Sequence, residues 1–116
     1  MTDHDIRALT AKVRAFNELR DWSQFHDPKN LAMALASEVG ELNALLRWVR
    51  NEDSDAAVRG DLRDQLIAEL GDVGILLLSL CDRAGVDLVT AIESKLRLND
   101  ERYPVDVSHA RAERPR

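Results

Sequence analysis

The apolar residues of this chain recur at the spacing of amphipathic helices along most of its length. Steps of three and four residues from Ile6 to Phe16 predict a first helix, capped by Thr2 or Asp3 and ending near Arg20. No stretch alternates apolar and polar residues for long enough to predict a β-strand. The pattern is therefore typical of an all-α protein.

A second helix begins at Asp27-Pro28, because a capping residue is followed there by the imino acid favoured at the first helical position. Its apolar period continues to about Arg50. Residues 51–60 are polar, which predicts a surface connection with one short helical turn.

A third helix is predicted from about Asp61 to Ala84, where Gly85 tolerates the left-handed backbone that ends many helices. Asp87 caps a fourth helix, which stops at Tyr103-Pro104. Short connections favour antiparallel neighbours, so we expect one four-helix bundle-type domain over residues 1–104. Residues 105–116 form a polar C-terminal tail.

Two short acidic phrases stand out within the second and third helices, Glu38-Val39-Gly40-Glu41 and Glu69-Leu70-Gly71-Asp72. At about 100° per residue, each phrase places its first carboxylate inside the apolar arc of its helix and its second carboxylate at the edge of that arc. The arcs consist of Leu31, Leu35, Leu42, Leu45, Leu46 and Val49 in the second helix, and of Leu62, Leu66, Val73, Leu76, Leu77 and Leu80 in the third. Two antiparallel helices with this layout would bring the four acids together.

Four inward-facing carboxylates need a compensating cation, because a buried unpaired carboxylate costs several kcal/mol. Oxygen ligands select Mg²⁺ or Mn²⁺ over zinc and copper. None of the histidines stands at the Glu-x-x-His spacing of di-iron bundles; they are His4, His26 and His109. The alternative is that all four acids face solvent or form salt bridges, as charged helical residues usually do.

Magnesium held by a few carboxylates completes its coordination with water and substrate phosphates, which points to phosphoryl-group chemistry. The chain has no Gly-x-x-x-x-Gly-Lys phosphate loop. Its net charge of −5 argues against nucleic-acid and anionic-membrane partners, and no apolar run approaches the length of a membrane span. The single cysteine, Cys81, is expected in the core of a protein of the reducing cytoplasm.

The third helix carries apolar residues outside its main arc, namely Ile67, Ile75 and Leu78. A monomer of 116 residues would leave this second apolar face exposed. The sequence therefore predicts a homodimer or a larger homo-oligomer.

Five phrases in this order resemble the MazG-type all-α nucleoside triphosphate pyrophosphohydrolases, in particular their dCTP pyrophosphatase-like branch. The resemblance covers roughly residues 5 to 105. It rests on the stretch from Arg20 to Leu31, on Glu38-Val39-Gly40-Glu41-Leu42 with Arg47-Trp48, on Glu69-Leu70-Gly71-Asp72-Val73, on Lys95 with Asn99, and on Arg102-Tyr103-Pro104.

This resemblance implies an Mg²⁺-dependent enzyme, with Mn²⁺ as a substitute, that cleaves a nucleoside triphosphate to a monophosphate and pyrophosphate. It implies a catalytic domain over residues 1–104 that assembles as a homodimer or homotetramer, with sites near subunit interfaces. The implied metal ligands and catalytic residues are Glu38, Glu41, Glu69 and Asp72. The implied substrate contacts are Trp22, His26, Trp48, Lys95, Asn99, Arg102 and Tyr103.

The sequence departs from the family at three positions. Ser37 replaces the first acid of a frequent Glu-Glu pair, while Val13 and Leu76 stand where dCTP-specific relatives would have His and Tyr, so the base preference stays open. Without the resemblance, Lys95 is typical of a surface lysine and Trp48 of a core or interface residue. The alternative function is a non-catalytic oligomerisation or regulatory module that binds nucleotide or a divalent ion.

Overall fold

The structure is a computed structural model that describes residues 5–110, and its regular elements are all helices. The four long helices are α1 (Ile6–Leu19), α2 (Pro28–Leu46), α4 (Arg63–Ala84) and α5 (Leu88–Arg102). The short elements are η1 (Ser23–Phe25), η2 (Asn51–Asp53), α3 (Ser54–Arg59) and α6 (Val105–Ser108). The predicted all-α class is confirmed. Within residues 5–110, no helix is both long and apolar enough to cross a bilayer.

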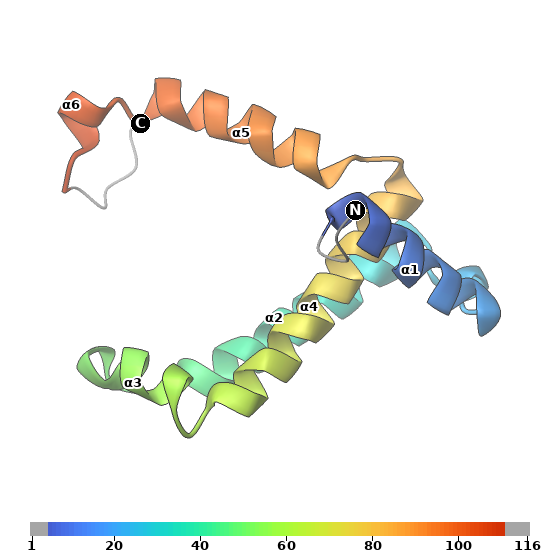
Figure 1. Ribbon diagram of the computed structural model, residues 1–116, viewed down its shortest axis with the longest axis horizontal. Helices are drawn as coiled ribbons and strands as arrows, with labels where there is room; N and C mark the ends of the chain where they lie inside the picture. Colours follow the sequence, from blue (N-terminus) through green and yellow to red (C-terminus); the bar gives the residue numbers. More distant parts are fainter. Residues whose placement is uncertain (1–4, 111–116) are drawn as a thin grey trace.

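The body of the molecule is the pair formed by α2 and α4, which run side by side in opposite directions (Figure 1). Helix α1 packs against α4 near the end of the pair where α2 begins. The fully buried apolar side chains, Val13, Leu31 and Leu78, come one from each of these three helices. The core therefore lies at one end of the pair, and the acidic phrases lie further along it.

The helix boundaries agree with the sequence to within a few residues, with three corrections. The described cap of α1 is Asp5, whose side chain accepts hydrogen bonds from the amides of Arg7 and Ala8, so the helix starts after Thr2 and Asp3. Helix α2 ends at Leu46 rather than near Arg50, because the chain turns early toward η2. The third long helix starts at Arg63. Residues 1–4 and 111–116, including much of the predicted tail, lie outside the described residues.

Helix α5 leaves the body of the molecule after a sharp turn (Figure 1). Gly85 adopts the left-handed backbone predicted for it, with φ of 70°, and Asp87 caps α5 by accepting from the amide of Thr90. Within the described chain, α5 packs along no other helix. A single chain therefore supplies four long helices without closing them into a bundle.

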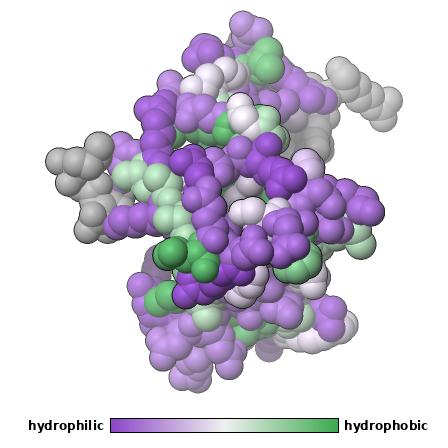
Figure 2. Space-filling model, turned by 90° about the vertical axis from the view of Figure 1, so that its right-hand side faces the viewer, coloured by the Kyte–Doolittle hydropathy of each residue, from purple (hydrophilic) through white to green (hydrophobic). Residues whose placement is uncertain are grey.

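Many large apolar side chains are exposed. The sequence predicted such exposure for the second apolar face of α4. Ile67 and Ile75 of α4 are 55% and 47% exposed, although Leu78, which we expected beside them, is buried. Ile92 and Leu96 of α5 are also exposed. Figure 2 shows apolar patches among the polar residues of one face. Cys81 is half-buried rather than fully packed in the core.

Replacing Gly85 by alanine should lower the free energy of unfolding by about 1 kcal/mol, because an L-residue is strained at positive φ. Gly74→Ala is the matched control. Gly74 lies inside α4, a Cβ there meets no atom within 4 Å, and alanine favours the helix by up to about 1 kcal/mol. Urea unfolding measures both variants. An equal loss of stability in the two would contradict this account of the turn.

Candidate functional site

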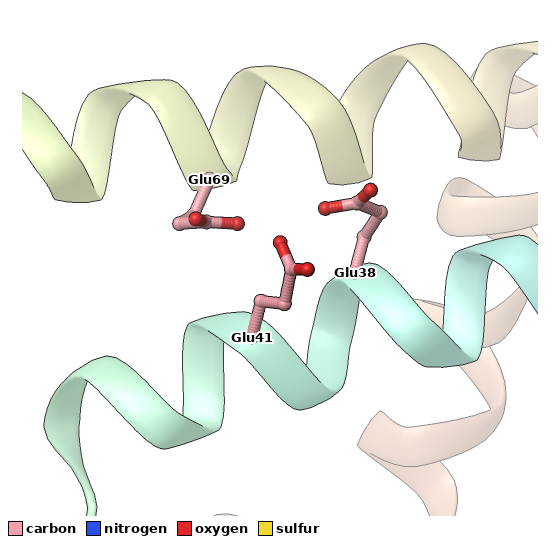
Figure 3. A group of neighbouring side chains, drawn as sticks. All are labelled: Glu38, Glu41 and Glu69. Atoms are coloured by element: carbon pink, nitrogen blue, oxygen red, sulfur yellow. The ribbon is translucent and has the colours of Figure 1, made fainter.

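Three carboxylates converge between α2 and α4. Glu38 and Glu41 project from α2, and Glu69 projects from α4 into the same space (Figure 3). One oxygen from each side chain lies within 4.8 Å of one oxygen from each of the others. The arrangement follows from the sequence, because residues three apart share a helix face and the apolar arcs hold the two helices together.

The electrostatics of this acidic cluster fit a hard divalent cation. Atom Oε2 of Glu38 and atom Oε2 of Glu69 are shielded from solvent and have no hydrogen-bond partner in the structure. Burial raises the pKa of both carboxyls, and the neighbouring Glu41 carboxylate raises the pKa of each further. Buried acceptors without a donor, held beside like charges, are satisfied by an oxygen-preferring ion such as Mg²⁺.

Asp72 lies outside the group of three converging carboxylates. Its side chain is exposed, yet it is near enough to raise the pKa of Glu38 and the pKa of Glu69 by charge repulsion. The burial follows the predicted arcs, since Glu38 and Glu69 are half-buried while Glu41 and Asp72 are exposed. The role of Asp72 as a fourth metal ligand stays a prediction.

A second group of predicted residues lies where α1, η1 and α2 meet. The ring of Trp22 meets Phe16 edge-on at 5.7 Å between centroids and meets His26 edge-on at 6.5 Å. His26 also lines a small cavity of about 50 Å³ between α1, α2 and α4. Trp22 is 43% exposed, so its ring has surface available for a ligand.

The buried wall of this small cavity carries a polar pair that the sequence analysis did not single out. Asn17 Nδ2 donates to Ser79 Oγ at 3.3 Å, and both residues are buried. Leu31 of α2 also lines the cavity, and seven residues separate it from Glu38 of the acidic cluster, which corresponds to about 10 Å of helix. The small cavity and the acidic cluster therefore lie about two helical turns apart.

A third group lies on α5, away from both others. Lys95, Asn99, Arg102 and Tyr103 line one cavity of about 200 Å³, and the Arg102 guanidinium stands 5.7 Å from the centroid of the Tyr103 ring. Their common location was predicted. Their distance from the acidic cluster was not, because in one chain α5 diverges from α2 and α4 (Figure 1).

Trp48 stands apart from all three groups, just beyond the end of α2. Its side chain is 85% exposed, and the Arg47 guanidinium lies 5.7 Å from the centroid of its ring. Such exposure is inconsistent with a core position within one chain. An exposed indole of this kind suits a contact with a ligand or with another subunit.

Two ion pairs between distant parts of the chain were missed by the sequence analysis. Arg14 Nη2 meets Asp82 Oδ1 at 2.6 Å, and Arg7 Nη2 meets Asp87 Oδ2 at 3.0 Å. Each arginine holds the pKa of its partner carboxyl below the usual range, chiefly through its hydrogen bonds. One feature of the sequence pointed to these pairs: Arg7 and Arg14 are seven residues apart, which places both on one face of α1.

Fold and site together define an all-α protein built on an antiparallel helix pair, with an acidic cluster between the helices that could hold a divalent cation. No protein-family model matches the sequence. Individual proteins do match: dCTP pyrophosphatase 1 from Rattus norvegicus is 45% identical over 96% of this chain, and the Homo sapiens protein is 42% identical over 94%. The chain spans 64% and 63% of the length of these two relatives.

A solved structure provides the fuller match. A pyrophosphatase from Archaeoglobus fulgidus superposes with a TM-score of 0.80 at 34% identity, covering 90% of this chain and 96% of the other. The chain belongs to the MazG-type all-α family of nucleoside triphosphate pyrophosphohydrolases, in the branch similar to dCTP pyrophosphatase.

The metal-free protein should become more stable as the pH falls from neutral. Because the folded-state pKa values of Glu38 and Glu69 are raised, their stabilising protonation is complete below the unfolded value of about 4.3 and is lost as the pH rises through the folded values. Glu38→Gln should therefore raise the melting temperature at pH 7 and flatten its pH dependence. The exposed Glu101→Gln variant is the control. An unchanged pH profile in Glu38→Gln would contradict the assignment.

Proposed function

We propose that this chain hydrolyses a nucleoside triphosphate between the α and β phosphates, releasing a nucleoside monophosphate and pyrophosphate with the help of Mg²⁺. The observation that carries this proposal is the acidic cluster, with its two shielded acceptor oxygens and its position between two rigid helices. Family membership and the names of the relatives support it. The single cysteine supports the further proposal that the protein acts in the cytoplasm.

In this proposal the acidic cluster holds the ion through Glu38, Glu41 and Glu69, with Asp72 as a fourth ligand. A bound divalent cation would supply Lewis acidity and screen the phosphate charges. One cluster carboxylate orients the attacking water and accepts its proton. The water oxygen forms a bond to the α-phosphorus, and the bond from that phosphorus to the α–β bridging oxygen breaks, so pyrophosphate leaves.

The cationic residues of α5 would bind the leaving group. Lys95 and Arg102 donate to the β and γ phosphates, where negative charge increases as the bond breaks, and Asn99 donates to a phosphate or the sugar. Tyr103 lies beside Arg102, within reach of the sugar of a nucleotide bound at that cavity. These roles follow the family resemblance and suit the chemistry of each side chain.

The base would lie against Trp22, because a flat indole supports a base at roughly 1–3 kcal/mol per stack. His26 and the small cavity border this position. Because Trp48 lies beyond the opposite end of α2, it would cover the base only as the residue of another copy of the chain. The names of the relatives make a deoxynucleoside triphosphate, dCTP first, the substrate to test. The side chains of Val13 and Leu76 are hydrocarbons, so neither can donate or accept a hydrogen bond with a base.

The proposal requires a second copy of the chain. One chain keeps its acidic cluster and its α5 cations apart, whereas a nucleotide would need both within the length of a triphosphate. We propose a homodimer or homotetramer in which α5 of one copy reaches the acidic cluster of another. The many exposed large apolar side chains support this assembly, because a second copy would remove part of their surface from water.

A nucleotide panel with Mg²⁺ and product identification tests the reaction. We expect a deoxynucleoside monophosphate and pyrophosphate, and we expect Glu38→Ala and Asp72→Ala each to reduce turnover at least about 100-fold while the protein stays folded. Glu101→Ala is the matched control. Release of orthophosphate and a diphosphate would overturn the bond assignment. Stabilisation by Mg²⁺ and nucleotide with no product would favour the regulatory module.

Mixing two inactive variants tests the shared site. Glu38→Ala removes a metal ligand and Lys95→Ala removes a phosphate contact, so each protein alone should have little activity. If sites combine α5 of one copy with the cluster of another, mixed oligomers contain some sites with both residues intact. Activity should therefore recover to roughly a quarter of the wild-type level in an equimolar mixture of dimers, by random pairing. No recovery despite subunit exchange would contradict the arrangement.

A further inference from the structure

A bidentate ion pair joins the start of helix α5 to α1. Arg7 Nε donates to Asp87 Oδ1 at 3.1 Å, and Arg7 Nη2 donates to Asp87 Oδ2 at 3.0 Å. The same carboxylate caps α5 by accepting from the amide of Thr90 at 3.1 Å and from its hydroxyl at 2.6 Å. Asp87 thus joins the first turn of α5 to α1.

Packing within the chain does little to fix the direction of α5. The helix lies along no other described helix. Leu88 and Val89 of its first turn are half-buried, whereas Ile92, Leu96 and Leu98 further along are 46%, 61% and 56% exposed. The connection before it consists of Gly85, in the left-handed region, the exposed Val86 and the capping residue Asp87. Backbone hydrogen bonds close the turn itself, from the amides of Gly85 and Val86 to the carbonyls of Asp82 and Cys81, and the ion pair joins the first turn of α5 to α1.

The length of α5 magnifies any change at this turn. Asn99 stands twelve residues after Asp87, about 18 Å along the helix at about 1.5 Å per residue. A tilt of about 10° at the turn would therefore move Asn99 by roughly 3 Å. Misplacement by about 1 Å can already lower a catalytic rate substantially.

We propose that Arg7 is a positioning residue. By pairing with Asp87, the cap of α5, it sets the angle between α5 and the pair of helices α2 and α4. That angle determines where Lys95, Asn99 and Arg102 lie. The catalytic part of this inference rests on the proposed function, whereas the structural part does not. Arg7 itself is exposed, and exposed ion pairs contribute little to the free energy of unfolding. The effect of losing the pair should appear in the direction of α5 more than in stability.

The angle of α5 can be measured directly with spin labels. The labels are attached to Ala36→Cys on α2 and Arg97→Cys on α5, in a Cys81→Ser background. They report the distance between α2 and α5, and both sites are exposed. Dilution with excess unlabelled chain restricts the signal to pairs within one chain. Arg7→Met should shift or broaden the distance distribution by about 3 Å or more, and Arg7→Lys should do so less, because lysine keeps the charge but not the bidentate fork.

The matched control is Arg50→Met, which breaks the exposed pair with Glu52 far from the turn and should leave the distribution unchanged. An Arg7→Met distribution identical to that of the wild type would overturn the inference. This measurement needs no turnover, so it decides the positioning role even if no nucleotide is hydrolysed and the proposed function fails.

Kinetics test the catalytic consequence. Arg7→Met should raise KM for the nucleotide about 3- to 10-fold and leave the affinity for Mg²⁺ in the absence of nucleotide unchanged, because the acidic cluster lies on α2 and α4. Arg7→Lys should restore part of the loss. A purely structural role would instead lower the melting temperature and the fraction of active protein at constant KM, and that result would contradict a positioning role in catalysis.

Discussion

The packing of α2 against α4 is the contact on which the rest of the structure depends. Apolar arcs along both helices supply the free energy of this contact, and the contact in turn forces three carboxylates of like charge into one space. Their mutual repulsion would separate two isolated helices. The buried core at one end of the pair, formed by Leu31, Leu78 and Val13, offsets that repulsion. The acidic cluster therefore depends on apolar packing that lies further along the same two helices.

The segregation of charge along one chain explains how both proposed binding groups remain available. If Lys95 and Arg102 reached the acidic cluster of their own chain, they would pair with its carboxylates, and that pairing would compete with the metal and phosphate binding proposed for the two groups. The divergence of α5 prevents this internal pairing (Figure 1). The geometry keeps the anionic and the cationic group of one chain apart, and in the proposed function a metal-bound phosphate would lie between such groups of two copies.

The parts of this structure that could be predicted are those that depend on neighbours in the sequence. Helix period placed Glu38 and Glu69 on buried arcs and Glu41 and Asp72 at their edges, and the burial of each agrees. The Gly85 turn was predicted from its preference for positive φ. The direction of α5 was not, because it depends on Arg7 and Asp87, which are far apart in the sequence. A charged residue on an exposed helix face gives no sign of which distant partner it meets.

The thin interior has a consequence for how the protein behaves at different concentrations. Within residues 5–110, few apolar side chains are fully buried, so a separate chain has little free energy with which to offset the entropy of folding. Burial supplied by a second copy would then be part of the folding free energy itself, and the fraction of folded protein would rise with its own abundance. At low concentration the unfolded chains would be degraded by proteases. The amount of folded protein would then rise more than in proportion to its rate of synthesis.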